Sequence, residues 1–220
     1  MARAGTRRVN ARITLVGGIF ALISMIVGTV CTLGALLRYT IFPFRGLPIP
    51  LIPYPLPVIN TGFSIWYQAI SELGIGPSAF IFNVGLIVLG FLILPIFPAL
   101  LGLLRNSTIA KVGVVSGLVT CFGIVGVGLA PMVMSPLHSV FGIIFFVSVG
   151  VTVFLLSLAM FRGKFFARAV AFYGFFFVVV DLIFMIVSTS IWEWAVFFVL
   201  VTWILLVGIE MLRKHKVTEI

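Results

Sequence analysis

Six long runs of apolar residues determine what this chain can fold into. A run of about 20 apolar residues is long enough to cross the hydrocarbon core of a bilayer as a helix. Of the 220 residues, 62% are hydrophobic and 9% are charged, whereas a soluble domain carries about 25% charged residues. A soluble core of this length could not bury so many apolar side chains. This excludes a disordered chain, a small disulfide-rich scaffold and an ordinary soluble enzyme.

We therefore predict an all-α polytopic membrane protein, in which one bundle of six transmembrane helices forms a single domain over residues 1–220. The expected spans cover residues 13–37, 79–104, 112–130, 138–161, 169–187 and 194–212. Pro95 and Pro98 fall inside the second span. A proline removes a backbone hydrogen bond from a helix, so we expect this span to kink.

Small residues form two seams along the predicted helices. In the first span they recur at steps of three and four residues, at Gly17, Ala21, Ser24, Gly28, Cys31 and Ala35. In the third span, Gly113, Gly117 and Cys121 share one face. Helices in lipid associate through close packing of small residues, so both seams favour helix contacts, and a pore or ligand groove is the alternative. The two cysteines are expected to stay unpaired.

The basic residues lie between the apolar runs and give the expected orientation. The net charge is +9. With the N-terminus in the cytoplasm, the cytoplasmic segments hold twelve basic residues: Arg3, Arg7, Arg8, Arg12, Arg105, Lys111, Arg162, Lys164, Arg168, Arg213, Lys214 and Lys216. The outer segments hold only Arg38 and Arg45. Cytoplasmic loops retain Lys and Arg, so we predict a multi-pass protein of the cell membrane with both termini cytoplasmic.

Membrane lipids are the expected partners. A membrane-protein partner or a homo-oligomer stays open, and nucleic acid is not expected.

The segment between the first two spans has an unusual composition. The outer loop at 38–64 is rich in proline, with Pro43, Pro48, Pro50, Pro53, Pro55 and Pro57 separated mostly by apolar residues. Such a density of prolines favours an extended, polyproline-like backbone, so we expect a stiff flap over the outer end of the bundle. Residues 64–74 then alternate apolar and polar side chains at helical spacing, which predicts a short helix lying in the outer interface.

A few polar residues occur where lipid should not tolerate them. An ionisable residue inside a span is costly, so it usually has a partner or a function. At about 1.5 Å per residue, Asn83 lies about 9 Å and Asp181 about 12 Å below the outer surface, and His138 opens the fourth span. We predict that Glu72, Asn83, His138 and Asp181 converge on one outward-facing polar pocket. Arg38 is the nearest cation.

Each of these residues also has a purely structural interpretation. Asn83 can hydrogen-bond a neighbouring helix, His138 can be an interfacial residue, and a buried pair at Asp181 can fix helix register. Glu193 is expected in the aromatic belt beside Trp192 and Trp194. Glu210 precedes Arg213 and Lys214 at the spacing of a surface salt bridge.

The motifs of common cofactor chemistry are missing from the sequence. No phosphate-binding GxxxxGK[ST] loop is present. The chain has two histidines, and a zinc site would have to recruit Asp, Glu or Cys around His138. We predict no metal and no cofactor.

Residues 69–87 carry a family resemblance. Ala69-Ile70-Ser71-Glu72-Leu73-Gly74 followed by Ala79-Phe80-Ile81-Phe82-Asn83-Val84-Gly85-Leu86-Ile87 resembles the "IS[DE]LG … A … FN.GL" signature of the domain of unknown function 998 family. His138 at the start of the fourth span also fits that pattern. The resemblance implies a six-span membrane protein of archaeal or bacterial type. The layout is more distantly similar to eukaryotic six-span proteins linked to autophagy modulation and phosphoinositide-kinase regulation, which implies lipid handling or partner regulation.

We favour a non-enzymatic function in which an outer-leaflet polar pocket, formed by Glu72, Asn83, His138, Asp181 and Arg38, binds a lipid or small amphiphile. Three alternatives stay open. The protein could be an accessory subunit of a larger membrane complex. It could be an intramembrane hydrolase of lipid head groups, with Asp181 and His138 as the catalytic acid–base pair. It could also be an ion-coupled transporter centred on Asp181.

Overall fold

The described part of the chain is almost entirely helical. A computed structural model describes residues 2–41, 63–104, 107–163 and 165–218, with side chains described from residue 12 to residue 214 within these ranges. No strand occurs in these ranges. The elements are α1 (Ala2–Ile41), η1 (Ile70–Gly74), η2 (Gly76–Ser78), α2 (Ala79–Ile93), α3 (Ile96–Leu103), α4 (Thr108–Leu129), η3 (Met132–Met134), α5 (Ser135–Arg162), α6 (Arg168–Val187) and α7 (Ser190–Thr218).

Six helical segments in the described ranges are long and apolar enough to cross a membrane, which confirms the predicted fold class. They are Arg12–Ile41, Gly76–Leu103, Thr108–Leu129, Met132–Arg162, Arg168–Val187 and Ser190–Lys214. Most of the proline-rich loop predicted at 38–64, namely residues 42–62, lies outside the described residues. Both described cysteines are free, as expected.

The second span is interrupted at Pro95, which separates α2 from α3. The Leu94 N–H donates to the Phe91 oxygen at 3.3 Å, and the Phe97 N–H donates to the Leu94 oxygen at 3.3 Å. Both are three-residue steps that replace the regular α-helical ladder, because proline has no N–H to donate. The predicted kink is confirmed.

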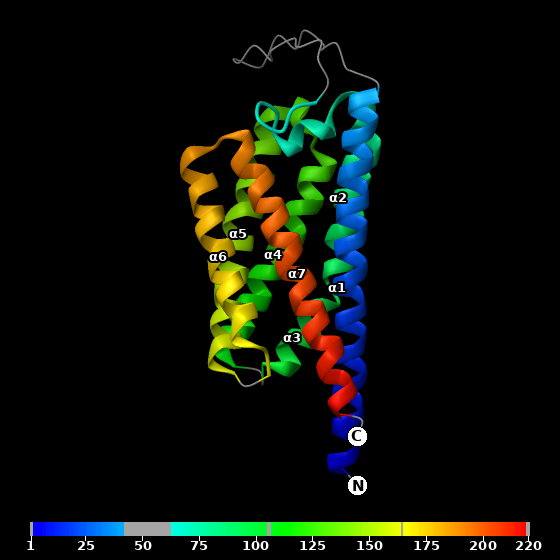
Figure 1. The fold of residues 1–220 in the computed structure, drawn as a ribbon, viewed down its shortest axis with the longest axis vertical. Coiled ribbons are helices and arrows are strands. Elements are labelled where there is room, and N and C mark those ends of the chain that lie inside the picture. Colours follow the sequence, from blue (N-terminus) through cyan, green and yellow to red (C-terminus); the bar gives the residue numbers. More distant parts are fainter. Residues whose placement is uncertain (1, 42–62, 105–106, 164, 219–220) are drawn as a thin grey trace.

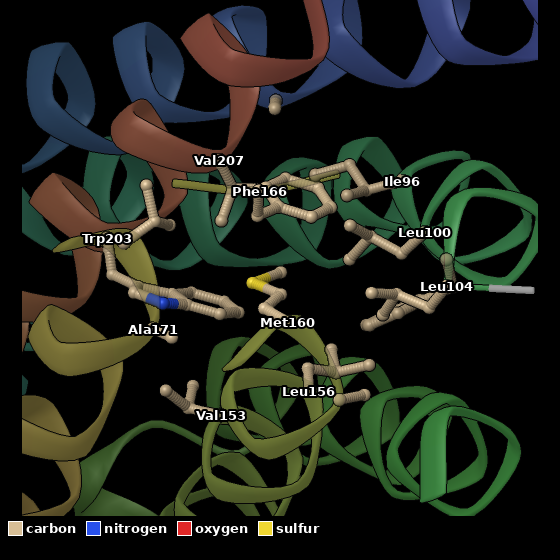
Figure 2. Packing of buried hydrophobic residues seen from close by; sticks show 14 of the residues in the cluster. Ile96, Leu100, Leu104, Val153, Leu156, Met160, Phe166, Ala171, Trp203 and Val207 are labelled. Carbon is tan, nitrogen blue, oxygen red and sulfur yellow. The ribbon is translucent and has the colours of Figure 1, made fainter. Parts of the chain in front are cut away.

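The spans form a ring in sequence order. Each spanning helix packs against the next one along the chain, and α7 closes the ring against α1. Both termini lie at one end of the bundle, which we call the terminal end, and η1 lies at the other end, the η1 end (Figure 1). One large apolar core lies between the helices and includes Met160 of α5, Trp203 of α7 and Leu100 of α3 (Figure 2).

The small-residue seams pack against neighbouring helices. A Cβ atom at Gly17 would lie 2.3 Å from the Cβ of Ala99 on α3, and one at Gly117 would lie 2.2 Å from the ring of Phe97. Such short distances mean that only glycine permits the observed helix spacing. The helix-contact interpretation of both seams is confirmed at these positions.

The segment before α2 differs from the single helix predicted at 64–74. A turn at residues 65–67 leads into extended backbone at Ala69, and a 3-10 helix follows at Ile70–Gly74. The physical reason is that the polar side chains bind the backbone. The Ser64 N–H donates to Gln68 Oε1 at 2.8 Å, and the Ala69 N–H donates to Glu72 Oε1 at 3.0 Å. We call residues 63–78 the η1 segment.

Candidate functional site

An elongated cavity of about 160 Å³ lies inside the ring. Its wall is formed by α1, η1, α2, α3, α4, α5 and α7 and is almost entirely apolar. Its lining includes Ile96, Leu100, Val153, Leu156, Trp203 and Val207, all of which are labelled among the buried side chains in Figure 2. An apolar interior space of this kind stays free of water and accepts apolar groups.

The lining residues extend along the helices. On α5 they run from His138 to Leu156, and on α7 they run from Glu193 to Val207. At 1.5 Å per residue these stretches span about 27 Å and about 21 Å. The volume of about 160 Å³ is close to that of a cavity that accepts one benzene molecule, so the space holds a short apolar group.

The η1 end of the cavity is polar. Ser71 from η1, His138 from α5 and Glu193 from α7 line it. Glu193 is 7% exposed, and its carboxylate interacts with the Ser71 hydroxyl, with the backbone N–H groups of Ile70 and Ser71, and with the neighbouring Glu72 carboxylate. The sequence placed Glu193 in the aromatic belt. It instead lies inside the bundle, because η1 covers the first turn of α7.

The His138 imidazole is held by the backbone. Its Nδ1 lies 2.8 Å from the backbone oxygen of Ala130. A carbonyl oxygen can only accept, so this contact assigns the proton to Nδ1 and leaves Nε2 of the neutral ring as an acceptor. The backbone of the α4–α5 connection therefore orients the imidazole.

Three of the predicted site residues hold the η1 segment in place. The Asn83 amide donates to the Gly74 oxygen at 2.9 Å, Arg38 Nε donates to the Pro77 oxygen at 2.6 Å, and Glu72 accepts from the Ala69 N–H. None of the three lines the cavity. Their side chains satisfy backbone groups that a short 3-10 segment at the membrane boundary cannot pair internally.

Burial also perturbs Glu72. Partial removal from water raises the pKa of its carboxyl above the usual value, and the hydrogen bonds from Ala69 and Gln68 offset part of the rise. Desolvation disfavours the charged form of an acid, and accepted hydrogen bonds favour it. Glu72 thus supports the η1 segment while also lying beside Glu193 at the mouth of the cavity.

Asp181 lies apart from the cavity, because α6 contributes no lining residue. The side chain is 3% exposed, and its Oδ2 lies 2.5 Å from where a Cβ at Gly150 of α5 would stand. Its Oδ1 has no hydrogen-bond partner among the described residues. The structure therefore does not bring all of the predicted polar residues to this cavity. Among the five predicted residues only His138 lines the cavity, and the ligand roles of the other four stay predictions.

The same geometry separates the two candidate catalytic residues. Asp181 contacts α5 at Gly150, twelve residues beyond His138, which is about 18 Å along the helix axis. A general acid and base must lie within hydrogen-bond reach of a shared substrate. Within the described residues, no group of three His, Cys, Asp or Glu side chains lies close enough to hold a metal ion.

A cluster of hydroxyl groups at mid-depth was missed by the sequence interpretation. Thr120 of α4 donates to Ser148 Oγ at 3.0 Å and lies 3.3 Å from Thr152 Oγ1, while Ser148 and Thr152 also donate to α5 backbone oxygens. Thr120 and Thr152 line the cavity. Serine and threonine at four-residue spacing are common in membrane helices, so the sequence of one helix does not reveal the cluster. The cluster is recognised only when α4 is known to pack against α5.

The comparisons with known proteins give one match. Residues 46–210 match a family described as protein of unknown function (DUF998). The matched range includes residues 69–87, which carry the resemblance noted in the sequence, four of the spans that follow the first, and the last span as far as residue 210. No curated protein and no solved structure matches the chain.

Proposed function

Because the chain belongs to the DUF998 family, whose description names no activity, we propose its function from the cavity inside the ring. The protein is a non-enzymatic membrane protein that binds part of one apolar chain of a lipid or small amphiphile between its helices. The single observation that carries this proposal is an apolar cavity whose η1 end carries a carboxyl, an imidazole and a hydroxyl group. That distribution of polarity matches an amphiphile.

The volume supports a short apolar segment in the cavity. About 160 Å³ is close to the volume of a cavity that accepts one benzene molecule, so the cavity takes up about six carbon atoms of a chain and not a whole acyl chain. Those atoms gain dispersion contacts with the surrounding wall, and two chains side by side would not fit.

The η1 end supports binding of the polar part of the ligand. Glu193 and the Nε2 atom of His138 are acceptors, and the Ser71 hydroxyl can donate or accept. These groups suit a head group that carries hydroxyl or amine donors. If both termini are cytoplasmic, as the basic residues predict, this end faces the outer leaflet.

Photolabelling tests the proposal. The probe is a long-chain monoacylglycerol with a photoactivatable diazirine in the middle of its chain, added to the full chain in mild detergent. Labelling is expected on the cavity wall, for example around Thr120, Phe145 and Leu200. Labelling confined to lipid-facing side chains such as Phe122 and Ile186 would overturn the proposal.

Two glycines provide a matched pair of variants. Gly142 lines the cavity, Gly102 is exposed on α3, and a Cβ at either position meets no atom within 4 Å. Gly142→Leu should therefore fill the cavity and reduce interior labelling several-fold, while Gly102→Leu should leave the labelling unchanged. Equal labelling of both variants would contradict occupation of the cavity by the probe.

A second pair tests the polar end. Glu193→Gln replaces a carboxyl group that lines the cavity, whereas Glu72→Gln replaces a neighbouring carboxyl group that does not. We expect the first variant to weaken competition by an amine-bearing single-chain amphiphile more than the second does. A larger effect of Glu72→Gln would place the head group elsewhere.

A further inference from the structure

Among the described side chains, basic residues outnumber acidic residues at the terminal end of the bundle. Six of the described basic side chains, Arg12, Lys111, Arg162, Arg168, Arg213 and Lys214, belong to the terminal end. The acidic side chain described there is Glu210, which is buried and lies 3.8 Å from Arg213. An excess of basic residues at the membrane boundary attracts anionic lipid head groups.

Two of these basic residues flank the turn between α5 and α6. Arg162 ends α5 and Arg168 begins α6, and both side chains are exposed. The first turn of α6 contains no acidic residue, and Ala167 at its N-cap offers no side-chain hydrogen bond. The N–H groups of that turn therefore add partial positive charge at the end of α6 that carries Arg168.

Exposed aromatic rings continue from this charged turn along α5 and α6. The Arg168 guanidinium carbon lies 5.7 Å from the centre of the Phe161 ring, a distance at which the ring attracts the cation. Phe161 and Phe172 pack edge to face at 5.5 Å between ring centres, and both are exposed. In a membrane protein these rings contact the acyl chains, directly beside the arginines that a phosphate would bind.

We propose that the described residues on either side of the α5–α6 turn form a binding site for an anionic phospholipid. Arg162, Arg168 and the first N–H groups of α6 bind its phosphate, and the exposed ring face of Phe161 and Phe172 packs against its acyl chains. The occupant is argued from charge complementarity: paired arginines bind phosphate oxygens strongly, and no described acidic side chain lies at this turn. The site is independent of the cavity and of its proposed ligand.

The test measures lipid binding to the full chain by native mass spectrometry, with phosphatidylglycerol and phosphatidylcholine titrated in separate samples. The variant is Arg162→Gln with Arg168→Gln. Its matched control is Arg12→Gln with Lys111→Gln, which removes two exposed charges from the same end on α1 and α4. The first double variant should bind phosphatidylglycerol about tenfold more weakly, because each basic residue near the surface contributes several-fold to anionic lipid binding.

The control double variant should bind phosphatidylglycerol as the unmodified chain does, and phosphatidylcholine binding should not change in either variant. An equal loss in the two double variants would overturn the proposal, since it would show attraction by diffuse charge. Retention of phosphatidylglycerol by the Arg162→Gln, Arg168→Gln variant would also overturn it. Soluble glycerol phosphate should show no binding, and equally tight binding of it would refute the role assigned to the rings.

Discussion

The indole N–H of Trp194, in the first turns of α7, donates a hydrogen bond to the backbone oxygen of Gln68 at 3.0 Å. The two residues are 126 positions apart in the chain. The bond joins the η1 segment to the helix that carries Glu193, and Trp194 is 2% exposed. The η1 segment, which covers the polar end of the cavity, is thus held by a long-range contact. This contact forms only when α7 has packed into the ring.

Trp194→Phe should weaken the attachment of the η1 segment to α7. Phenylalanine keeps part of the edge contacts with Phe63 and Phe197 but cannot donate, which leaves the Gln68 oxygen without its partner. We expect a loss of about 1–3 kcal/mol of local stability, read as faster hydrogen exchange of the amides from Gln68 to Ile75. Trp192→Phe removes an indole from the same turn and should leave that exchange unchanged; equal effects of both variants would contradict the assigned role of the bond.

The depth of a polar residue could be predicted from the sequence, but the direction in which it faces could not. Counting residues placed Asp181 well inside a span, and the structure agrees that it is buried. Whether α6 would border the interior of the ring depends on how six similar apolar helices pack. Nothing in the composition of α6 distinguishes it from the helices that line the cavity.

Glu193 shows what the sequence could have revealed. Glu193, Val196, Leu200, Trp203 and Val207 recur at steps of three, four, three and four residues, and all of them line the cavity. That period places Glu193 on the same face as the buried residues of α7. Its position between two tryptophans suggested the membrane interface instead, because the η1 segment that covers it could not be placed from local pattern.

Gly123→Ala should strongly destabilise the pairing of α4 with α5. A Cβ at Gly123 would lie 2.8 Å from the backbone N and Cα atoms of Phe145, and backbone atoms cannot move aside without shifting the helix. We expect a cost of about 1–3 kcal/mol, which is typical of overpacking, measured as a lower thermal unfolding midpoint in detergent micelles. Gly102→Ala meets no atom within 4 Å and should be neutral. A neutral Gly123→Ala would mean that the two helices are farther apart than described.

The pH dependence of stability at the η1 segment should follow Glu72. Its pKa is raised in the folded chain, mainly by burial, so the folded state binds a proton more tightly than the unfolded state does. Stability from this group is therefore present at low pH and is lost as the pH rises from about 4.5 through the raised pKa. Tyr39, Gln68 and Glu193 are the other groups that interact with this carboxyl.

Glu72→Gln should remove the contribution of Glu72 and keep an amide oxygen that can still accept from Ala69. The variant is expected to match the unmodified chain at pH 4 or below and to exceed its thermal midpoint increasingly as the pH rises above that value. A difference between the two proteins that stays constant with pH, or that has the opposite sign, would contradict the assigned direction.

Asp181→Leu should preserve or raise stability. The Asp181 Oδ1 atom is buried without a hydrogen-bond partner among the described residues, and a buried polar atom in that state costs about 1–3 kcal/mol. Leucine has a similar branched shape and no polar atom, so it can fill the space against Gly150 without that cost. Asp181→Ala serves as the comparison, because it removes the polar atoms but leaves a cavity, and it should be the less stable variant in thermal unfolding.

If Asp181→Leu instead lost more stability than Asp181→Ala, the carboxylate would have to make a stabilising contact, as the ion-coupled alternative requires. Proteoliposome flux of the same variants would then decide whether that contact serves transport.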